Sequence, residues 1–243
     1  MRIAALVPAY QAAAHLGEVL TRIAQLPGAP DVLVVDDGSR DGTGDIARQH
    51  GARLHTFAAN RGKGHALLAG FALLRDYDGV MTLDADGQHP PEVIPAFVQA
   101  FEHGADLVLG ARSRSGAMPL GRRFANGFSS GWTAWLAGQT VSDSQSGCRL
   151  YGRRMLDGTP LTPGRYEVET EAIVRAARLG FRLAEVAIPT VYGEEKSQIR
   201  AFRDVPRIMG TLARLTVEGV APPPAMRAAA VARGGDAAPP HAA

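Results

Sequence analysis

Apolar and polar positions along the first 112 residues fall into blocks that predict strands and helices in alternation. Short apolar runs predict strands, and these runs lie at 2–8, 31–37, 53–57, 79–83 and 105–112. Segments with apolar residues at helical spacing predict helices over 15–26, 43–51, 65–77 and 90–104. Repeated strand–helix units of this kind favour an α/β fold with a mainly parallel central sheet and helices on both faces.

The second half of the chain has a less regular pattern. Helical spacing recurs over 124–138 and 172–180, and the segment 204–215 is amphipathic and basic. Residues 221–243 are rich in Ala, Pro and Gly without periodicity, so we expect a disordered tail there. No linker-like composition interrupts the preceding part, which predicts a single domain over 1–220.

Special or polar residues follow four of the predicted strands at the point where each strand ends. They are Pro8, Ala9 and Tyr10; Asp36 and Asp37; Asp84, Ala85 and Asp86; and Gly110, Ala111 and Arg112. In sheets of parallel strands, ligands bind at the carboxyl ends of the strands. The sequence therefore predicts a binding crevice at this edge of the sheet.

The closely spaced carboxylates of Asp84 and Asp86 are the strongest candidate for chemistry. In an extended segment they point to the same side, and Gln88 reaches the same region if the extension continues. Two facing carboxylates repel unless a cation lies between them, and oxygen ligands of this kind suit Mg²⁺ or Mn²⁺. For an isolated pair, a helix cap and a solvated side chain would be the more common explanation.

A second acidic strand end, at Asp36 and Asp37, shifts the balance toward a binding site. Asp37 precedes a Gly-Ser turn and is predicted to make an Asx-turn, whereas Asp36 is placed to accept a hydrogen bond from a bound ring or ribose. Two acidic strand ends that face one crevice rarely arise by accident.

Composition narrows the class of protein. The formal net charge is +2, with 26 basic and 24 acidic residues, which argues against a dedicated nucleic-acid binder. The single cysteine, Cys148, excludes an intramolecular disulfide and fits a reducing compartment. The N-terminus has the pattern of a strand and not of a signal peptide, and no apolar stretch approaches the roughly 20 residues of a spanning helix. We therefore expect a cytoplasmic protein, with room for peripheral attachment to the inner face of the cell membrane.

Several motifs together resemble family 2 glycosyltransferases of the GT-A fold, in the branch of dolichyl- and polyprenyl-phosphate mannosyl- and glucosyltransferases. The motifs are "VPAYQ" (7–11), "VVDDGSRDGT" (34–43), "NRGKGHAL" (60–67), "LDADGQHPPE" (83–92), "DSQSGCRLY" (143–151), "YEVETE" (166–171) and "VYGEEKS" (191–197). They occur in the order of the family and cover most of residues 3–205. The chain departs from the pattern at Gln11, where Asn is usual, and keeps only Glu18 of the acidic run that follows.

The resemblance implies a nucleotide-sugar donor and a divalent cation, Mg²⁺ or Mn²⁺. The residues it implies around the nucleotide sugar are Pro8, Ala9, Tyr10, Glu18, Asp36, Asp37, Asp84 and Ala85. Asp84, Asp86 and Gln88 would hold the cation on the diphosphate, where it assists departure of the nucleoside diphosphate as a Lewis acid. Asp86 is accordingly expected to be catalytic. Family membership also implies inversion at the anomeric carbon.

Cationic side chains supply the remaining candidates. Lys63 lies in a glycine-containing motif that is not a Walker loop and is expected to bind the nucleotide sugar. Lys196 and Arg200 lie in the segment that covers the donor in the resembled family, and they are expected to close on its phosphates. Arg112 and Arg149 are the best candidates for phosphate contact and are expected to be catalytic. One of Arg122 and Arg123 joins them, although solvated surface arginines are the ordinary case.

The acceptor is expected to be a polyprenyl phosphate, which is already ionised at neutral pH because such groups have a second pKa of about 6. A hydroxyl acceptor would require a base, for which Asp143 is the candidate. Trp132 and Trp135 share one face of 124–138 and either pack in the core or meet the lipid at a membrane surface. A separate membrane-protein partner is compatible with either acceptor.

Three other functions compete with this prediction. A family 2 enzyme acting on a glycan or other hydroxyl acceptor would share the donor motifs. A sugar-1-phosphate nucleotidyltransferase would need a Gly-rich loop after the first strand, and no glycine occurs there before Gly17. A non-catalytic sugar-nucleotide-binding module would not need a metal ion on the leaving group.

Overall fold

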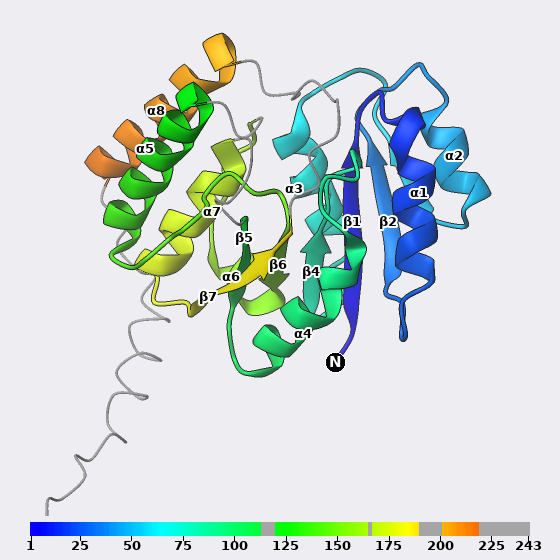
Figure 1. Cartoon of the computed structure of the whole chain (residues 1–243), viewed down its shortest axis with the longest axis horizontal. Coiled ribbons are helices and arrows are strands. Elements are labelled where there is room, and N and C mark those ends of the chain that lie inside the picture. The colour runs from blue at the N-terminus through cyan, green and yellow to red at the C-terminus, as the bar shows by residue number, and fades with distance from the viewer. Residues whose placement is uncertain (113–119, 165–166, 190–200, 219–243) are drawn as a thin grey trace, which may run out of the picture.

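The structure is a computed structural model that describes residues 1–112, 120–164, 167–189 and 201–218. A seven-stranded sheet with the order β3-β2-β1-β4-β6-β5-β7 forms its centre (Figure 1). The strands are β1 (Ile3–Ala9), β2 (Asp31–Asp36), β3 (Arg53–Thr56), β4 (Gly79–Thr82), β5 (Leu107–Arg112), β6 (Arg149–Gly152) and β7 (Leu183–Ile188). Strand β6 runs antiparallel to both of its neighbours, and every other strand pair is parallel. The predicted α/β class with a mainly parallel sheet is confirmed.

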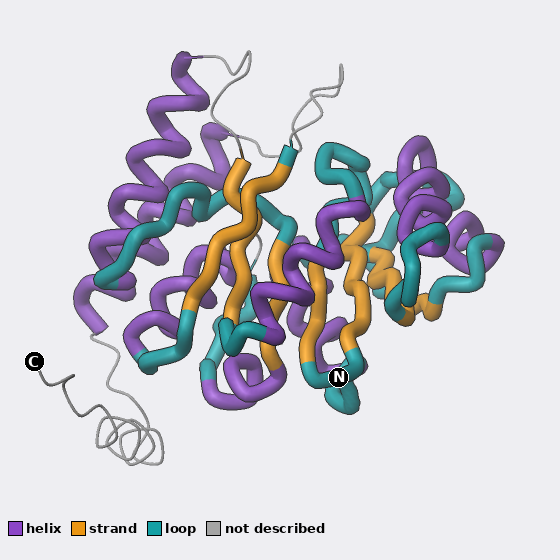
Figure 2. The backbone as a smooth tube through the Cα atoms, turned by 60° about the horizontal axis from the view of Figure 1, so that its bottom comes forward, coloured by secondary structure: helices purple, strands orange, loops and turns teal. Residues whose placement is uncertain are grey.

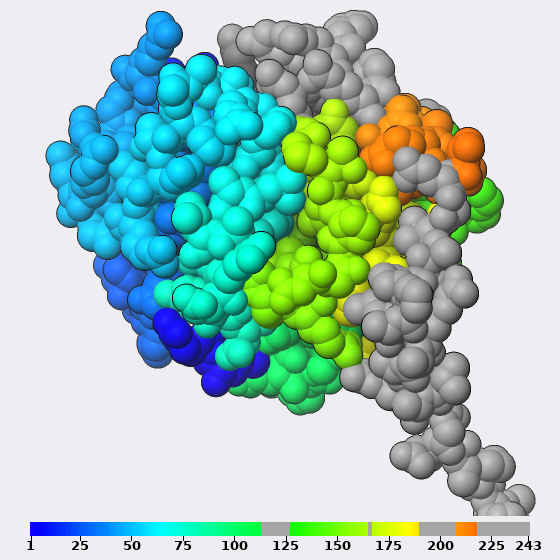
Figure 3. All heavy atoms as spheres, turned by 180° about the vertical axis from the view of Figure 1, so that it is seen from behind, coloured from blue at the N-terminus to red at the C-terminus, as the bar shows by residue number. Residues whose placement is uncertain are grey.

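Helices cover both faces of this sheet, as the alternating pattern predicts. They are α1 (Ala13–Ala24), α2 (Thr43–Gln49), α3 (Lys63–Leu73), η1 (Pro91–Val93), α4 (Ile94–Glu102), α5 (Leu120–Ala137), α6 (Arg153–Gly158), α7 (Glu167–Arg178) and α8 (Ala201–Glu218). Helices α1, α2 and α4 pack on one face. Helices α3, α6 and α7 pack on the other, which Figure 3 shows from behind, and α5 and α8 form an outer layer on α7.

Alternate residues of the central strands pack into two separate cores. Leu6 of β1 contributes to the core beneath α3, with Leu67 and Phe71. Its neighbour Val7 belongs to the opposite core beneath α1. Both residues are fully buried, because a strand with helices on each side needs apolar residues at every position. The helical spacing of Leu16, Val19, Leu20 and Ile23 correctly identifies the buried face of α1.

The late elements differ most from the sequence prediction. Strands β6 and β7 were not predicted, because a polar side chain interrupts the apolar pattern of each. Helix α7 begins at Glu167, five residues before the predicted start. The predicted disordered tail, 221–243, lies outside the described residues. Within those residues, none of the helices has the length and hydropathy needed to cross a membrane.

The chain changes direction across the sheet between β1 and β4. From β1 the chain proceeds to β2 and β3 on one side, and β4 then pairs with β1 on the other side. The carboxyl ends of β1, β2, β4 and β5 lie at one edge, which is the upper edge in Figure 1, and the tube in Figure 2 shows the loops that leave it. A reversal of strand order at this edge is where α/β sheets bind ligands.

One residue near this edge has an unfavourable backbone conformation. Gln11 has a φ of 51°, in the left-handed region that Asn tolerates better than Gln does. Its amide N–H donates to Ser39 Oγ at 2.9 Å, which fixes the turn after β1. The Asn that is usual at this position in the resembled family therefore has a physical explanation.

We expect Gln11→Asn to stabilise the protein by about 0.5–1 kcal/mol, because Asn lowers the cost of the left-handed conformation. The midpoint of thermal unfolding should rise by about 1–4 °C, measured by circular dichroism or calorimetry. The matched control is Gln99→Asn inside α4, which should leave the midpoint unchanged or lower it. An equal effect of both substitutions would contradict the backbone explanation.

Candidate functional site

The ends of β1 and β2 are joined by hydrogen bonds that use the first acidic pair. Ala9 lies beside Asp36 in the parallel register, and the amide N–H of Asp37 donates to the carbonyl of Ala9 at 2.8 Å. The Asp36 carboxylate is 3% exposed and accepts a hydrogen bond from the amide of Ser39 at 2.9 Å. Asp36 therefore stabilises the turn, which is the role that the sequence assigned to Asp37.

Asp37 instead fixes the segment that leads into α3. Its two carboxylate oxygens accept hydrogen bonds from the amides of Arg61 and Gly62, at 2.6 and 2.7 Å. The prediction of an Asx-turn at Asp37 is wrong, because this carboxylate reaches across to a loop 24 residues later. Since Gly62 immediately precedes Lys63, the first residue of α3, Asp37 also sets the position of that lysine.

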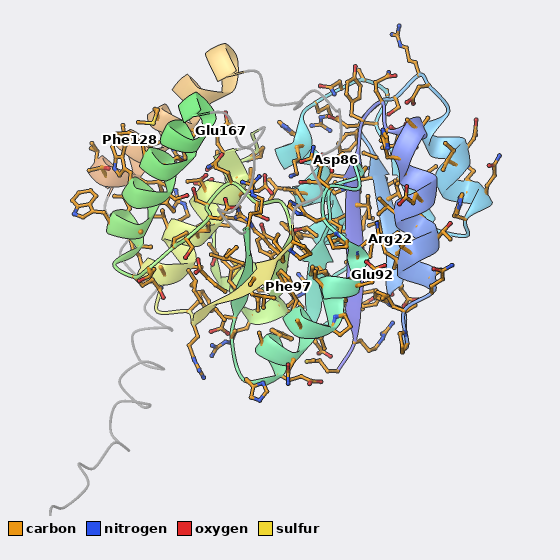
Figure 4. The ribbon with its side chains drawn as sticks, in the orientation of Figure 1. Arg22, Asp86, Glu92, Phe97, Phe128 and Glu167 are labelled. Carbon is orange, nitrogen blue, oxygen red and sulfur yellow. The ribbon has the colours of Figure 1, made fainter. Side chains whose placement is uncertain are left out.

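The other residues predicted around the nucleotide occupy two places. Pro8 is half-buried in β1, and Tyr10 is 39% exposed directly after the strand, at the carboxyl edge of the sheet. Glu18 lies on α1, where its carboxylate is 3.5 Å from Arg22. Arg22 makes a bidentate ion pair with Glu92 at 3.1 and 2.7 Å, and Figure 4 shows these two side chains together below Asp86. The structure thus places Glu18 in a surface ion-pair cluster that holds the end of the acidic motif against α1.

The acidic segment after β4 is not extended, so the geometric premise for Gln88 is wrong. The chain turns at residues 85–86, with Ala85 buried, and Gly87 has a φ of 71°. The amide of Gln88 donates to Asp86 Oδ1 at 3.0 Å, which closes the turn. Because the segment turns here, the rule that side chains two residues apart in an extended strand share one side does not apply to Asp84 and Asp86.

Lys63 binds the Asp84 carboxylate and a second carboxylate, that of Glu169. Lys63 Nζ donates to Asp84 Oδ1 at 2.6 Å and to Glu169 Oε1 at 3.1 Å. Burial alone would lower the pKa of Lys63, but the two carboxylates more than offset that effect and raise it. Burial likewise opposes ionisation of Asp84, and Lys63 nevertheless keeps the pKa of Asp84 below its ordinary value. Lys63 and Asp84 are therefore both charged at neutral pH.

A glycine allows the backbone to pass against this ion pair. A Cβ added to Gly147 would come within 2.6 Å of Lys63 Nζ and would also collide with the Asp84 carboxylate. Thr82 Oγ1 donates to the Gly147 carbonyl at 2.8 Å and holds the backbone in this place. Gly147 lies in the "DSQSGCRLY" motif, and this close approach explains the need for glycine there.

Arg112 leaves β5 at the same edge and pairs with Asp143. Its Nε donates to Asp143 Oδ2 at 2.5 Å and its Nη2 donates to Oδ1 at 3.0 Å. Burial tends to raise the pKa of Asp143, but the hydrogen bonds from Arg112 lower it below its ordinary value. An ion-paired carboxylate with a lowered pKa is a weak base, so Asp143 is better suited to positioning Arg112 than to deprotonating an acceptor.

Arg149 requires a correction. Its side chain is 0% exposed, and it donates to the carbonyls of Ser144 and Ser146 at 2.8 Å each and to the carbonyl of Glu169. These bonds occupy the guanidinium inside the protein, so the predicted phosphate contact by Arg149 is wrong. The arginine instead joins β6 to the 144–146 loop and to the first turn of α7.

The remaining cationic candidates have no described side chains. Lys196 and Arg200 lie outside the described residues, and the side chains of Arg122 and Arg123 are likewise not described. Their predicted contacts with phosphate groups stay predictions.

The histidine after the acidic motif is buried. His89 is 5% exposed, and the backbone of Pro189, just after β7, contributes to the electrostatic environment of its ring. Burial lowers the pKa of His89, so the ring is neutral at neutral pH. Its Nδ1 has no hydrogen-bond partner among the described residues. His89 therefore connects the acidic loop to the end of β7.

The exposure of the aromatic side chains on α5 tests whether the two tryptophans pack in the core. Trp135 is 69% exposed and Phe128 is 54% exposed, whereas Trp132 is half-buried and packs edge-on against Phe128. Core packing therefore does not explain Trp135. Cys148 is fully buried, as a small core residue is expected to be, and burial raises the pKa of its thiol.

Sequence reasoning did not identify Glu169 as a site residue. The only signal was the alternation of Glu167, Glu169 and Glu171 in "YEVETE", which also fits a helix N-terminus. The structure separates the members of this run. Glu169 pairs with Lys63, whereas Glu171 is 1% exposed and accepts hydrogen bonds from Thr162, Arg175 and Arg214. Glu171 thus anchors α8 and the 159–164 loop to α7.

The carboxylate oxygen atoms of the acidic motif are of the type that binds a divalent cation. Asp86 is partly exposed at the crevice edge, and Asp84 presents a second carboxylate on the same loop. Such hard oxygen ligands suit Mg²⁺ or Mn²⁺. Among the described residues, no three His, Cys, Asp or Glu side chains converge into a complete site. The carboxylates of this loop are therefore of a chemistry that suits either ion.

Comparisons with known proteins agree with this geometry. The sequence model described as "Glycosyl transferase family 2" matches residues 4–157. The chain is 34% identical to undecaprenyl-phosphate mannosyltransferase of Micrococcus luteus, covering 80% of this chain and 85% of that protein. It is 31% identical to polyprenol monophosphomannose synthase of Mycolicibacterium smegmatis, covering 77% and 76%.

A solved structure shows the same fold. Glucosyl-3-phosphoglycerate synthase of Mycobacterium tuberculosis, crystallised with Mn²⁺, uridine diphosphate and glucosyl-3-phosphoglycerate, superposes with a TM-score of 0.74 at 23% identity. The match covers 88% of this chain and 79% of that one. The expected GT-A fold is thereby confirmed.

Proposed function

Because the chain belongs to glycosyl transferase family 2, we propose that it transfers a hexose from a nucleotide sugar to a polyprenyl phosphate. The names of the two relatives, a mannosyltransferase and a phosphomannose synthase acting on polyprenyl carriers, support this acceptor class. The donor is of the GDP-mannose or UDP-glucose type. Inversion at the anomeric carbon and a divalent cation, Mg²⁺ or Mn²⁺, form part of the proposal.

The observation that carries the acceptor assignment is the state of the carboxylates on the β5 side of the crevice. Asp143 is bound to Arg112, and Glu169 is bound to Lys63. Both are ion-paired and buried, and the lowered pKa of Asp143 makes that carboxylate a poor general base. A phosphate acceptor needs no base because it is already an anion, and it benefits from a fixed arginine.

On the donor side, residues at different strand ends have different roles. Tyr10 and the β1–β2 edge offer a surface for the nucleotide, and the Asp36 and Asp37 bonds fix the loops on either side of it. Asp86, with Asp84 and Gln88 on the same loop, would hold the cation. When bound, that cation neutralises the charge that develops on the departing diphosphate.

The acceptor side consists of Arg112 and its supporting residues. Arg112 is oriented by two hydrogen bonds from its guanidinium to Asp143, in a fork that suits phosphate oxygens as well. The acceptor oxygen would attack the anomeric carbon on the face opposite the diphosphate, which inverts the configuration. No proton has to leave the acceptor in this step.

A peripheral contact with the membrane follows from a lipid acceptor. Phe128 and Trp135 are large aromatic side chains exposed on α5, in the outer layer that α5 forms with α8. Aromatic residues of this kind insert at the boundary between water and lipid. We propose that this layer faces the bilayer that holds the acceptor.

The test is a transfer assay with Mn²⁺, radiolabelled GDP-mannose or UDP-glucose, and undecaprenyl phosphate in detergent. We expect label in the lipid fraction with one of the two donors and a product whose anomeric configuration, determined by NMR, is inverted. Parallel reactions contain phosphoglyceric acid or a free oligosaccharide in place of the lipid. Label in either of these products, and none in lipid, would replace the proposed acceptor with a hydroxyl acceptor. Donor binding without transfer or hydrolysis would favour a non-catalytic module.

A further inference from the structure

The lysine beside the acidic motif occupies the position of a cation between two carboxylates. Lys63 Nζ lies 2.6 Å from Asp84 and 3.1 Å from Glu169, and the three side chains are 16%, 27% and 7% exposed. The ammonium group is thus a built-in counter-ion for one of the two aspartates expected to bind metal.

Hydrogen bonds fix the backbone on two sides of this arrangement. Asp37 holds the amide of Gly62, the residue before Lys63. Thr82 holds the carbonyl of Gly147, whose missing Cβ leaves the space for the ammonium and the Asp84 carboxylate. Because the surrounding backbone is held in place, the Lys63 ammonium can leave this position only by giving up its hydrogen bonds to Asp84 and Glu169.

A divalent ion that approaches Asp84 in the free enzyme meets this fixed positive charge. Repulsion between like charges is strong at a partly buried site, where the effective dielectric constant is lower than in water. Asp86 is not part of the lysine pair, but Mg²⁺ and Mn²⁺ bound by one or two carboxylates usually take further oxygen ligands from substrate phosphates.

We infer that Lys63 prevents the free enzyme from loading a divalent ion, so that the ion enters together with the nucleotide as a metal–diphosphate complex. Lys63 is then a positioning residue that sets the order of binding and holds the Asp84 carboxylate in place. The inference rests on the donor and metal assignment proposed above.

The first experiment measures Mn²⁺ held by the wild-type protein in equilibrium dialysis, with and without GDP or UDP. Nucleotide and Mn²⁺ without protein provide the baseline for ions held by the nucleotide in solution. We expect the apparent Kd for Mn²⁺ to be at least tenfold lower in the presence of the matching nucleotide. Mn²⁺ affinities within threefold of each other would overturn the inference and leave the transfer reaction, which is assayed separately, untouched.

The second experiment removes the internal cation. In Lys63→Met, Asp84 and Glu169 lose their shared partner, and we expect nucleotide-independent Mn²⁺ binding at least tenfold tighter than in the wild type. The double variant Lys63→Met/Glu169→Gln should lose most of this gain, whereas Glu169→Gln alone, which keeps the Lys63–Asp84 pair, should bind Mn²⁺ as the wild type does. Lys63→Met that folds but gains no Mn²⁺ affinity would overturn the inference.

The thermal midpoint of Lys63→Met tests the inference even if this variant is unstable. If Lys63→Met is unstable, added Mn²⁺ should raise its thermal midpoint by more than it raises that of the wild type, because an ion that binds only the folded state stabilises it. An equal shift in both proteins would count against the inference. Absence of Mn²⁺ uptake by the wild type even with either nucleotide would overturn both the inference and the metal assignment, whereas label in the lipid would still support the transferase.

Discussion

Asp86→Asn is expected to reduce hexose transfer at least a hundredfold while leaving the protein folded. The amide oxygen of Asn can still accept the hydrogen bond from the amide of Gln88, so the turn after β4 should persist. Only the negative charge is removed. Loss of a single group that stabilises developing charge typically costs a factor of about 10²–10³ in rate. The measurement is the rate of label transfer to undecaprenyl phosphate at saturating Mn²⁺.

Two further variants serve as comparisons for Asp86→Asn. Asp86→Ala should be equally inactive but slightly less stable, because it also removes the turn hydrogen bond. Asp157→Asn removes a charge from an exposed side chain on α6 and should transfer at the wild-type rate. Calorimetry should show that metal-dependent binding of the donor is lost in both Asp86 variants. An Asp86→Asn enzyme that keeps more than a tenth of the wild-type rate would contradict the assignment of Asp86 to the metal ion.

The part of the site that sequence reasoning located correctly is the part determined by local pattern. Apolar runs ending in Asp36, Asp84 and Arg112 were enough to place these residues at one edge of a parallel sheet. That inference needs only the direction of the strands and the rule that successive strand ends meet at one edge. The motifs carried the family assignment in the same way, since they depend on residue identity and order.

The direction of each side chain was harder to predict, because it depends on contacts between distant parts of the chain. The partner of Lys63 in α7 lies 106 residues later, and the antiparallel strand β6 is inserted between β4 and β5. Without β6 there is no basis for placing Arg149 inside the protein. The exchange of roles between Asp36 and Asp37 has the same origin, since Asp37 finds its partners in the loop before α3.

Arg149 offers the sharpest test of this distinction between a buried and a phosphate-binding arginine. Arg149→Met retains the volume of the side chain but leaves the carbonyls of Ser144, Ser146 and Glu169 without their donor. Each buried carbonyl left unpaired costs about 1–3 kcal/mol, so the loss for three carbonyls amounts to about 3–9 kcal/mol. That is a large fraction of a total stability of about 5–15 kcal/mol.

We therefore expect Arg149→Met to lower the thermal midpoint by about 10 °C or more, or to yield insoluble protein. The control is Arg48→Met, which removes an exposed arginine paired with Asp45 on α2 and should change the midpoint by no more than about 2 °C. If Arg149→Met instead left the midpoint unchanged and abolished transfer, the result would support a direct contact of Arg149 with phosphate. A folded and active variant would mean that the three carbonyls find other donors, which the 0% exposure of the site argues against because water has no access to them.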